Sequence, residues 1–282
     1  MRLSLFTALA LLLALAGCDN GNDNADKAPQ APAQSEQSES SHQPPASPAP
    51  PQARLEGKSE TLQRQPDQCQ SKECPKVDID LEVYAQQDAL NQAVRAQLIR
   101  QLAGNGKDDG SQATSLEAVA AGFIADAANL PDQGANGWEL TGETGLLDQR
   151  GSLATIKIDS YEFTGGAHGM PATHWLNWDL AANQRVRLAD VIEPGQQDAF
   201  WALAEQAHDQ WLKDEADADD DFRKAWPFQK TSDFRITDDG IVLLYGAYTI
   251  GPYVMGMPEL TLPREQLSGI VKERYLSADK PS

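Results

Sequence analysis

The chain has 282 residues, which allows one domain of about 200 residues once a leader and a linker are set aside. It carries 23 Lys plus Arg against 42 Asp plus Glu, a formal net charge of −19. Nucleic acids are bound by cationic surfaces, so this composition argues against a nucleic-acid partner and favours a basic one.

The first residues have the composition of a bacterial export signal. Arg2 supplies the positive start, and the apolar run from Leu5 to Ala16 is shorter than the ~20 residues of a membrane span. The segment Leu15-Ala16-Gly17-Cys18 resembles a lipobox, after which the cysteine carries the lipid. We therefore expect residues 1–17 to be a lipoprotein signal peptide and Cys18 to be lipidated. The alternative is ordinary secretory cleavage that leaves a stray thiol.

The resulting location is the bacterial cell envelope, with the protein lipid-anchored and facing the periplasm. Asp19 resembles a signal for retention at the inner membrane, but other bacteria read other positions, so the choice of membrane stays open.

Residues 18–75 are expected to be a disordered tether that ends in a small cysteine loop. Residues 19–54 contain no Val, Ile, Leu, Met, Phe, Trp or Tyr and cannot offset their own ordering entropy. In an exported protein, Cys69 and Cys74 are expected to form a disulfide. A redox pair would need a two-residue spacing, and a zinc site would need further ligands nearby.

The alternation of apolar and acidic residues from Val77 to Tyr84 predicts a strand, and the folded domain is placed at residues 76–282. Two amphipathic helices follow, around residues 90–102 and from a capping box at Thr114–Glu117. Further strands are predicted at 137–146, 153–163, 174–180, 185–188, 234–236, 241–245 and 259–262, with helices at 200–211 and 267–271. The strands and helices occur in separate groups along the chain and do not alternate strictly. This order favours a single α+β domain, with a mostly antiparallel sheet and helices packed on one face.

Three segments carry a family resemblance: Tyr161–Gly169, Trp175–Ile192 and Tyr248–Leu262. Together they resemble the RsiV-type extracytoplasmic domain, which also occurs beside the catalytic unit of PdaC-type peptidoglycan deacetylases. The resemblance covers most of residues 76–275 and implies an α+β ligand-binding domain outside the cytoplasm. One branch of that family is an anti-sigma factor that binds host lysozyme. We do not expect anti-sigma activity here, because neither a cytoplasmic segment nor a membrane-spanning helix is predicted. Nor do we recognise a deacetylase domain in the sequence.

Two glycine-rich segments are the candidates for a binding surface. They are the loop from Gly165 to Gly169 and the segment from Ala247 to Met257. The ligand-binding candidates in them are Gly165, Gly166, His168, Gly169, Tyr248, Pro252 and Tyr253. The structural alternative is that the glycines shape a strand crossing, that His168 caps it, and that the two tyrosines pin the last strand. His174 would share a face with His168 if one strand held both, but Pro171 is expected to break that strand.

No catalytic signature, metal site or cofactor site is predicted. The Gly-x-Ser-x-Gly elbow is missing, and no pair of carboxylates stands out in so acidic a chain. The acidic run from Asp214 to Asp221 resembles the start of a calcium loop, but Phe222 stands at the position of the turn glycine. The aromatic set Trp175, Trp178, Tyr245, Tyr248 and Tyr253 could line a carbohydrate groove, although packing is the favoured interpretation.

The function expected from the sequence is therefore capture of a ligand in the envelope, without catalysis. From Lys76 onward the chain has 17 Lys plus Arg and 33 Asp plus Glu, a net charge of −16 that would steer a cationic partner. A basic protein such as a lysozyme-like muramidase, or a peptidoglycan fragment, is the expected ligand. The alternative is a cell-wall glycan hydrolase or deacetylase that uses His168.

The lipid anchor gives a direct prediction. Cys18→Ala removes the thiol that the lipid would occupy, so the variant is expected to move from the membrane to the soluble fraction. Fractionation of cells expressing each form measures this. If the variant stays with the membrane, Cys18 is not the anchor.

Overall fold

The computed structural model describes residues 53–67, 69, 73–104, 113–130, 134–214 and 218–277. The expected leader, Cys18 and most of the tether lie outside this part of the chain. Cys69 and Cys74 form a disulfide, with their Cα atoms 5.8 Å apart. Within the described residues, no helix is both long and apolar enough to cross a membrane.

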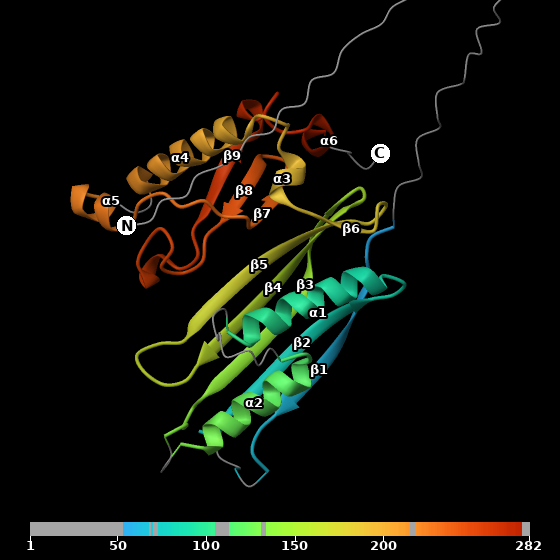
Figure 1. Cartoon of the computed structure of the whole chain (residues 1–282), viewed down its shortest axis with the longest axis vertical. Coiled ribbons are helices and arrows are strands. Elements are labelled where there is room, and N and C mark those ends of the chain that lie inside the picture. Colours follow the sequence, from blue (N-terminus) through green and yellow to red (C-terminus); the bar gives the residue numbers. More distant parts are fainter. Residues whose placement is uncertain are drawn as a thin grey trace, which may run out of the picture. The chain divides into compact units, whose positions relative to one another are not determined.

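The larger sheet has six strands in the order in which they occur along the chain (Figure 1). They are β1 (Gly57–Arg64), β2 (Lys76–Tyr84), β3 (Glu139–Arg150), β4 (Leu153–Phe163), β5 (Met170–Asp179) and β6 (Gln184–Val186). Every neighbouring pair is antiparallel except β2 and β3, which are parallel. Parallel neighbours need a crossover connection, and two helices provide it here.

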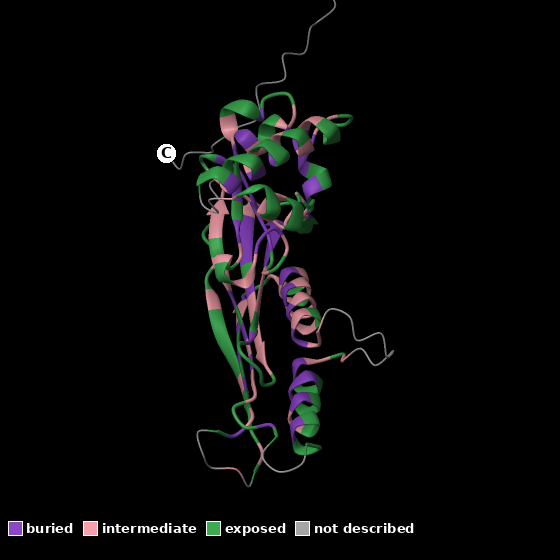
Figure 2. Ribbon diagram, turned by 90° about the vertical axis from the view of Figure 1, so that its left-hand side faces the viewer, coloured by how far each residue is buried: buried purple, intermediate pink, exposed green. Residues whose placement is uncertain are grey.

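These two helices, α1 (Asp88–Leu102) and α2 (Leu116–Ala128), cover one face of the larger sheet (Figure 1). Figure 2 shows their buried residues on the side that faces the strands. Leu90, Val94 and Leu98 of α1 pack on the inward residues of β2 and β4, which belong to the same core. A Cβ atom at Gly142 would lie only 3.0 Å from the Leu98 side chain, so this glycine permits the close approach of α1.

The second sheet has three antiparallel strands and its own core. They are β7 (Phe234–Ile236), β8 (Gly240–Leu244) and β9 (Glu259–Pro263). The amphipathic helix α4 (Gln197–Asp214) packs against them through Phe200 and Ala204. The remaining elements are short: α3 (Leu188–Val191), α5 (Asp220–Ala225), η1 (Tyr253–Met255), η2 (Arg264–Gln266) and α6 (Glu273–Leu276).

The α+β class and the helices packed against a mostly antiparallel sheet are confirmed, but the folded region begins before residue 76. Strand β1 falls within the stretch that the sequence assigns to the tether, and it pairs with β2 from Gly57 to Arg64. Most of its side chains are exposed. An edge strand of this kind is held by its backbone ladder, so it lacks the apolar alternation by which strands are recognised.

Three local expectations are corrected. Strand β5 runs through Pro171, which pairs with Tyr161 near the strand's end. The helix expected at residues 267–271 is absent, because Gly269 has a φ of 74° and the chain turns there before α6. The N-cap of α2 is Ser115 rather than Thr114, and its hydroxyl accepts a hydrogen bond from the Ala118 amide at 3.1 Å.

A buried histidine makes stability dependent on pH. His208 of α4 lies in the second core beside Trp211, and its Nε2 atom has no hydrogen-bond partner among the described residues. Burial lowers the pKa of His208, so below about pH 6.5 the unfolded chain binds a proton that the folded chain does not. Acid therefore destabilises the fold at this position. We expect His208→Leu to lose less thermal stability than the wild type between about pH 7 and about pH 5.

Thermal unfolding at the two pH values measures this difference. His168→Gln is the control that removes a histidine lying outside the second core, because His168 is exposed. Equal losses for His208→Leu and the wild type would contradict the interpretation.

Candidate binding site

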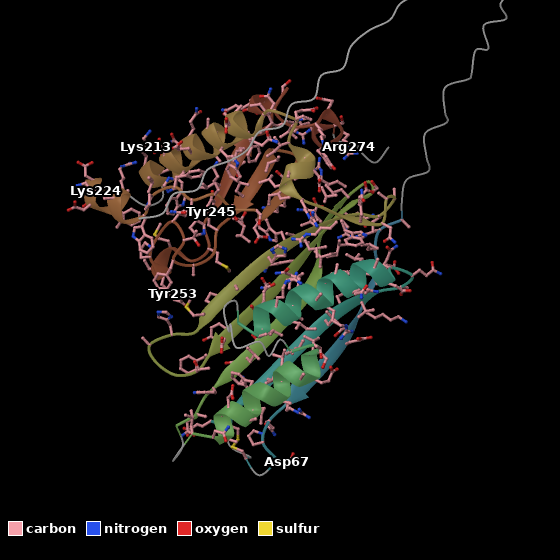
Figure 3. The ribbon with its side chains drawn as sticks, viewed as in Figure 1. Asp67, Lys213, Lys224, Tyr245, Tyr253 and Arg274 are labelled. Atoms are coloured by element: carbon pink, nitrogen blue, oxygen red, sulfur yellow. A yellow bond between two sulfur atoms is a disulfide. The ribbon has the colours of Figure 1, made fainter. Side chains whose placement is uncertain are left out.

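The two glycine-rich segments proposed from the sequence lie against each other. One is the β4–β5 loop and the other is the β8–β9 loop (Figure 1). The His168 ring stacks on Tyr253 with 3.8 Å between ring centroids and 18° between planes. Tyr248 reaches the other side of the histidine, with its hydroxyl 3.2 Å from Nε2. We call His168, Tyr248 and Tyr253 the aromatic cluster; Figure 3 labels Tyr253 on its loop.

The hydrogen bonds of His168 assign its tautomer. Nδ1 lies 3.1 Å from the Gly169 carbonyl, which can only accept, so Nδ1 carries the proton. Nε2 faces the Tyr248 hydroxyl, which can donate or accept a hydrogen bond. The Tyr253 hydroxyl donates to the same Gly169 carbonyl at 2.9 Å. His168 is therefore held between the two loops through both ring nitrogens.

Tyr248 is held in an uncommon backbone conformation. Its φ is 63°, and its side chain is 46% exposed. A non-glycine residue in the left-handed region costs about 1–3 kcal/mol, and such residues cluster at functional sites. Met170, at the start of β5, and Val254 of η1 are also exposed, at 45% and 86%, so apolar side chains in and beside the two loops face solvent.

The other predicted residues have mostly structural positions. Gly165 and Gly166 shape the β4–β5 loop with φ values of 99° and 93°, and Pro252 precedes η1. His174 lies apart from His168, bonded to Asp233 and Arg185. Of the aromatic set, Trp175, Trp178 and Tyr245 are buried, as the packing interpretation expected, whereas Tyr248 is exposed.

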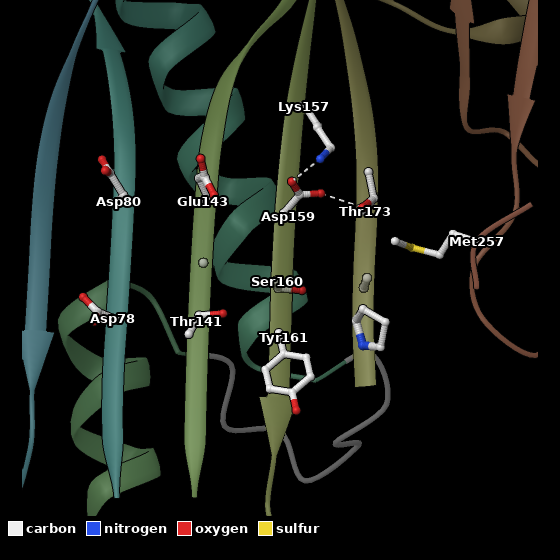
Figure 4. Close-up of a pocket in the computed structure, with 13 residues that line it drawn as sticks. Asp78, Asp80, Thr141, Glu143, Lys157, Asp159, Ser160, Tyr161, Thr173 and Met257 are labelled. Carbon is white, nitrogen blue, oxygen red and sulfur yellow. Dashed lines mark hydrogen bonds and ion pairs between the residues drawn. The ribbon is translucent and has the colours of Figure 1, made fainter. Parts of the chain in front are cut away.

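A groove that the sequence did not reveal lies on the face of the larger sheet opposite α1 and α2 (Figure 4). Its volume is about 600 Å³, and its floor is formed by outward side chains of β2, β3, β4 and β5. Met257 of the β8–β9 loop borders it beyond β5. The polar side chains that line it are Asp78, Asp80, Thr141, Glu143, Lys157, Asp159 and Thr173.

Three of these carboxylates form a row across adjacent strands (Figure 4). Asp80 is the register partner of Glu143, and Glu143 is the partner of Asp159. We call these three residues the carboxylate row. Directly opposite side chains lie about 4.5–5.5 Å apart, and like charges so placed repel each other. Asp159 has compensating contacts, with the Lys157 ammonium at 2.6 Å and the Thr173 hydroxyl at 2.5 Å.

Tyr161 connects the groove to the aromatic cluster. Its ring lines the groove and lies across Gly169, where a Cβ atom would come within 2.3 Å of it. Gly169 in turn accepts the Tyr253 hydroxyl. Tyr161 and Gly169 therefore lie between the groove and the aromatic cluster.

The acidic run from Asp214 to Asp221 has a different role where it is described. Asp219 caps α5, and its carboxylate accepts the Phe222 amide at 2.8 Å. In the described part of the chain, no group of three or more His, Cys, Asp or Glu is arranged to hold a metal ion.

The carboxylate row could not be read from the sequence. The alternation in β2 places Asp78 and Asp80 on the polar face, and that was the available signal. Their proximity to Glu143 and Asp159 depends on the register between strands that are distant in the chain. Register is a tertiary property, and no local pattern specifies it here.

Comparisons with known proteins agree on one family. The model of the family described as protein of unknown function, DUF3298, matches residues 189–265. The chain is similar to a DUF3298 family protein from Pseudomonas aeruginosa PAO1, with 33% identity, a TM-score of 0.70, and 81% of this chain and 99% of that one covered. A DUF3298 member from Bacteroides fragilis NCTC 9343 shares the fold at 20% identity and a TM-score of 0.59, over 77% of this chain and 94% of that one. No curated protein matches the sequence.

Gly169 gives a test of how the surface is built. Gly169→Ala would force the Tyr161 ring to move, and we expect a loss of about 1–3 kcal/mol in the free energy of unfolding. Gly122→Ala is the matched control, because an added Cβ meets nothing within 4 Å on α2. The control should gain about 0.5–1 kcal/mol. Urea unfolding measures both, and a Gly169→Ala variant as stable as the wild type would show that Tyr161 does not depend on this glycine.

Proposed function

The chain belongs to the DUF3298 family, and we propose that it is a lipid-anchored binding domain of the bacterial cell envelope that captures a cationic ligand without catalysis. The proposal places the domain on the periplasmic side of a membrane, held by the lipid on Cys18. It leaves open which membrane that is.

The carboxylate row in its groove is the observation that carries this proposal. Its three carboxylates are neighbours on an uncovered sheet face, and Lys157 is the one cation among the residues that line the groove. Repulsion within the row is relieved when a cation binds. A ligand with clustered positive charge therefore gains from every carboxylate it contacts, and the net charge of the domain would speed its approach.

A basic protein fits this surface better than a peptidoglycan fragment does. Peptidoglycan stem peptides carry carboxylates of their own, which the row would repel. A protein surface can offer lysine or arginine to the groove and apolar groups to the aromatic cluster at the same time. The resemblance to the RsiV-type domain supports the same class of partner, and a lysozyme-like muramidase is the example we propose to test.

The aromatic cluster would supply rigid contact area. Tyr253 has its hydroxyl bonded and its ring stacked, so it loses little conformational freedom when a partner packs on it. His168 has both ring nitrogens in contact with neighbouring groups of the protein. We therefore assign His168 to positioning the loops and do not propose an acid–base role for it.

A binding measurement with a basic lysozyme tests the proposal. We expect the combined variant Asp80→Asn, Glu143→Gln and Asp159→Asn to bind about tenfold more weakly at low salt. We also expect wild-type binding to weaken as the ionic strength rises to about 0.15 M, where the screening length falls to about 8 Å. Titration calorimetry at the two ionic strengths measures both effects.

The control removes three exposed carboxylates elsewhere, with Glu205→Gln, Asp220→Asn and Glu265→Gln. It changes the net charge equally, so equal losses in the two variants would mean that overall charge and not the groove attracts the partner. Tyr253→Ala and His168→Ala test the aromatic cluster. If both lower the melting temperature and neither alters capture by the folded fraction, the cluster is structural. Absence of lysozyme binding at low salt would remove this partner.

A further inference from the structure

The two sheets are joined by a hydrogen-bonded histidine. The Asp233 carboxylate, just before β7, lies 2.7 and 2.9 Å from Nδ1 of His174 in β5. The same carboxylate accepts the Trp175 amide at 2.8 Å. On the other side of the ring, the Arg185 guanidinium of β6 lies 2.9 Å from Nε2. We call His174, Asp233 and Arg185 the junction triad.

The partners of His174 fix its protonation. A guanidinium can only donate, so Nε2 must keep its lone pair to accept from Arg185. A carboxylate can only accept, so Nδ1 carries the proton that is donated to Asp233. The ring is therefore neutral, buried and engaged at both nitrogens.

Adding a second proton to this ring requires its hydrogen bonds to rearrange. It would place an N–H group at Nε2 against the N–H groups of Arg185, and two donors at that distance repel. The bond between Arg185 and His174 must then open, while the bond between His174 and Asp233 becomes an ion pair. Protonation thus releases β6 and leaves the link to β7 intact.

The surrounding charges are few. Asp233 favours the protonated ring, and Arg185 opposes it. Arg100 of α1 and Arg187 are the further cations whose charge acts on Arg185. On the β4 side, the register partner of His174 is the uncharged Ile158. Histidine is the one side chain whose ordinary pKa lies between about pH 5 and pH 8, and this sets the pH range over which the triad is tested.

We propose that His174 is a positioning residue through which protonation loosens β6 and weakens the coupling between the two sheets. Strand β6 has three residues paired with β5, so one side-chain bond is a large part of its attachment. It is also the segment that leads from the larger sheet into the second core, where Val186 and Leu188 are buried.

The consequence for binding rests on the proposed function. The groove floor belongs to the larger sheet, whereas Tyr248, Tyr253 and Met257 follow β8 of the smaller one. A looser junction leaves these two halves of the surface less well fixed relative to each other. Capture of a cationic partner is then weaker in acid, beyond the effect of titrating carboxylates.

His174→Gln is the decisive variant, because the glutamine amide can donate to Asp233 and its carbonyl can accept from Arg185 without titrating. Hydrogen exchange of the β6 amides is followed from about pH 8 to about pH 5 and corrected for intrinsic rates. In the wild type we expect protection to fall by about 2–10-fold relative to His174→Gln as the pH falls, which is the equivalent of one hydrogen bond. A constant ratio between the two proteins across this range would overturn the proposal.

One further variant keeps the test informative. Arg185→Met removes the partner that protonation would expel, so β6 should be weakly protected at every pH and should lose the acid-induced change. If Arg185→Met keeps the wild-type acid response, the proposal is also wrong. The exchange experiment needs no ligand. A failure of lysozyme to bind would therefore remove the proposed function and leave the role of His174 to be decided by exchange alone.

Discussion

One carboxylate, that of Asp233, links the two sheets at the edge of the larger one. Strand β5 pairs with β6 over residues 177–179, which leaves the backbone N–H of Trp175 on an otherwise open edge. The Asp233 carboxylate accepts hydrogen bonds from that N–H and from His174. Two residues further along β5, the side-chain amide of Asn177 donates to the Phe234 carbonyl at 2.7 Å. Side chains thus continue the ladder where no strand does. The second sheet is held against the edge of the first by bonds that resemble strand pairing but tolerate a change of direction.

This attachment determines what the candidate surface can be. The groove floor is a rigid product of four strands in register, whereas its border beyond β5 comes from the β8–β9 loop of the other sheet. Tyr161 and Gly169 close the remaining gap by direct contact. A surface built from both sheets can be precise only if the junction between them is fixed. The polar network around Asp233 is therefore as important to the site as the groups that face solvent.

Much of the architecture follows from local sequence signals, and the site follows from them only in part. Strand β4 and strand β7 have the predicted limits, because clear apolar patterns and turn residues bound them. The segments that hold His168 and Tyr253 can be predicted as candidate binding loops, because both are rich in glycine and lack the periodicity of a strand or helix. Strand β1 and the carboxylate row escape prediction for one reason: neither is encoded by a local pattern. Both depend on which strand lies beside which, and for β2 and β3 that pairing is made through the crossover that contains α1 and α2.

The face of the larger sheet opposite α1 and α2 has one part that the second sheet covers and one part that is open, and the change occurs between two neighbouring residue pairs on that face. Lys157 faces Trp175, and one pair further along, on the same face, Asp159 faces Thr173. Trp175 is buried against Val242 and Leu244 of β8, with Met257 packed beside them. Beyond this point the outward residues become acidic, and a covering element would have to desolvate the carboxylates of Asp80 and Glu143, at a cost of several kcal/mol unless it brought compensating cations. The same polarity that keeps the second sheet from extending over the groove leaves the groove accessible to a cation. The limit of one core and the existence of the candidate site are thus consequences of the same change in side-chain chemistry along β4 and β5.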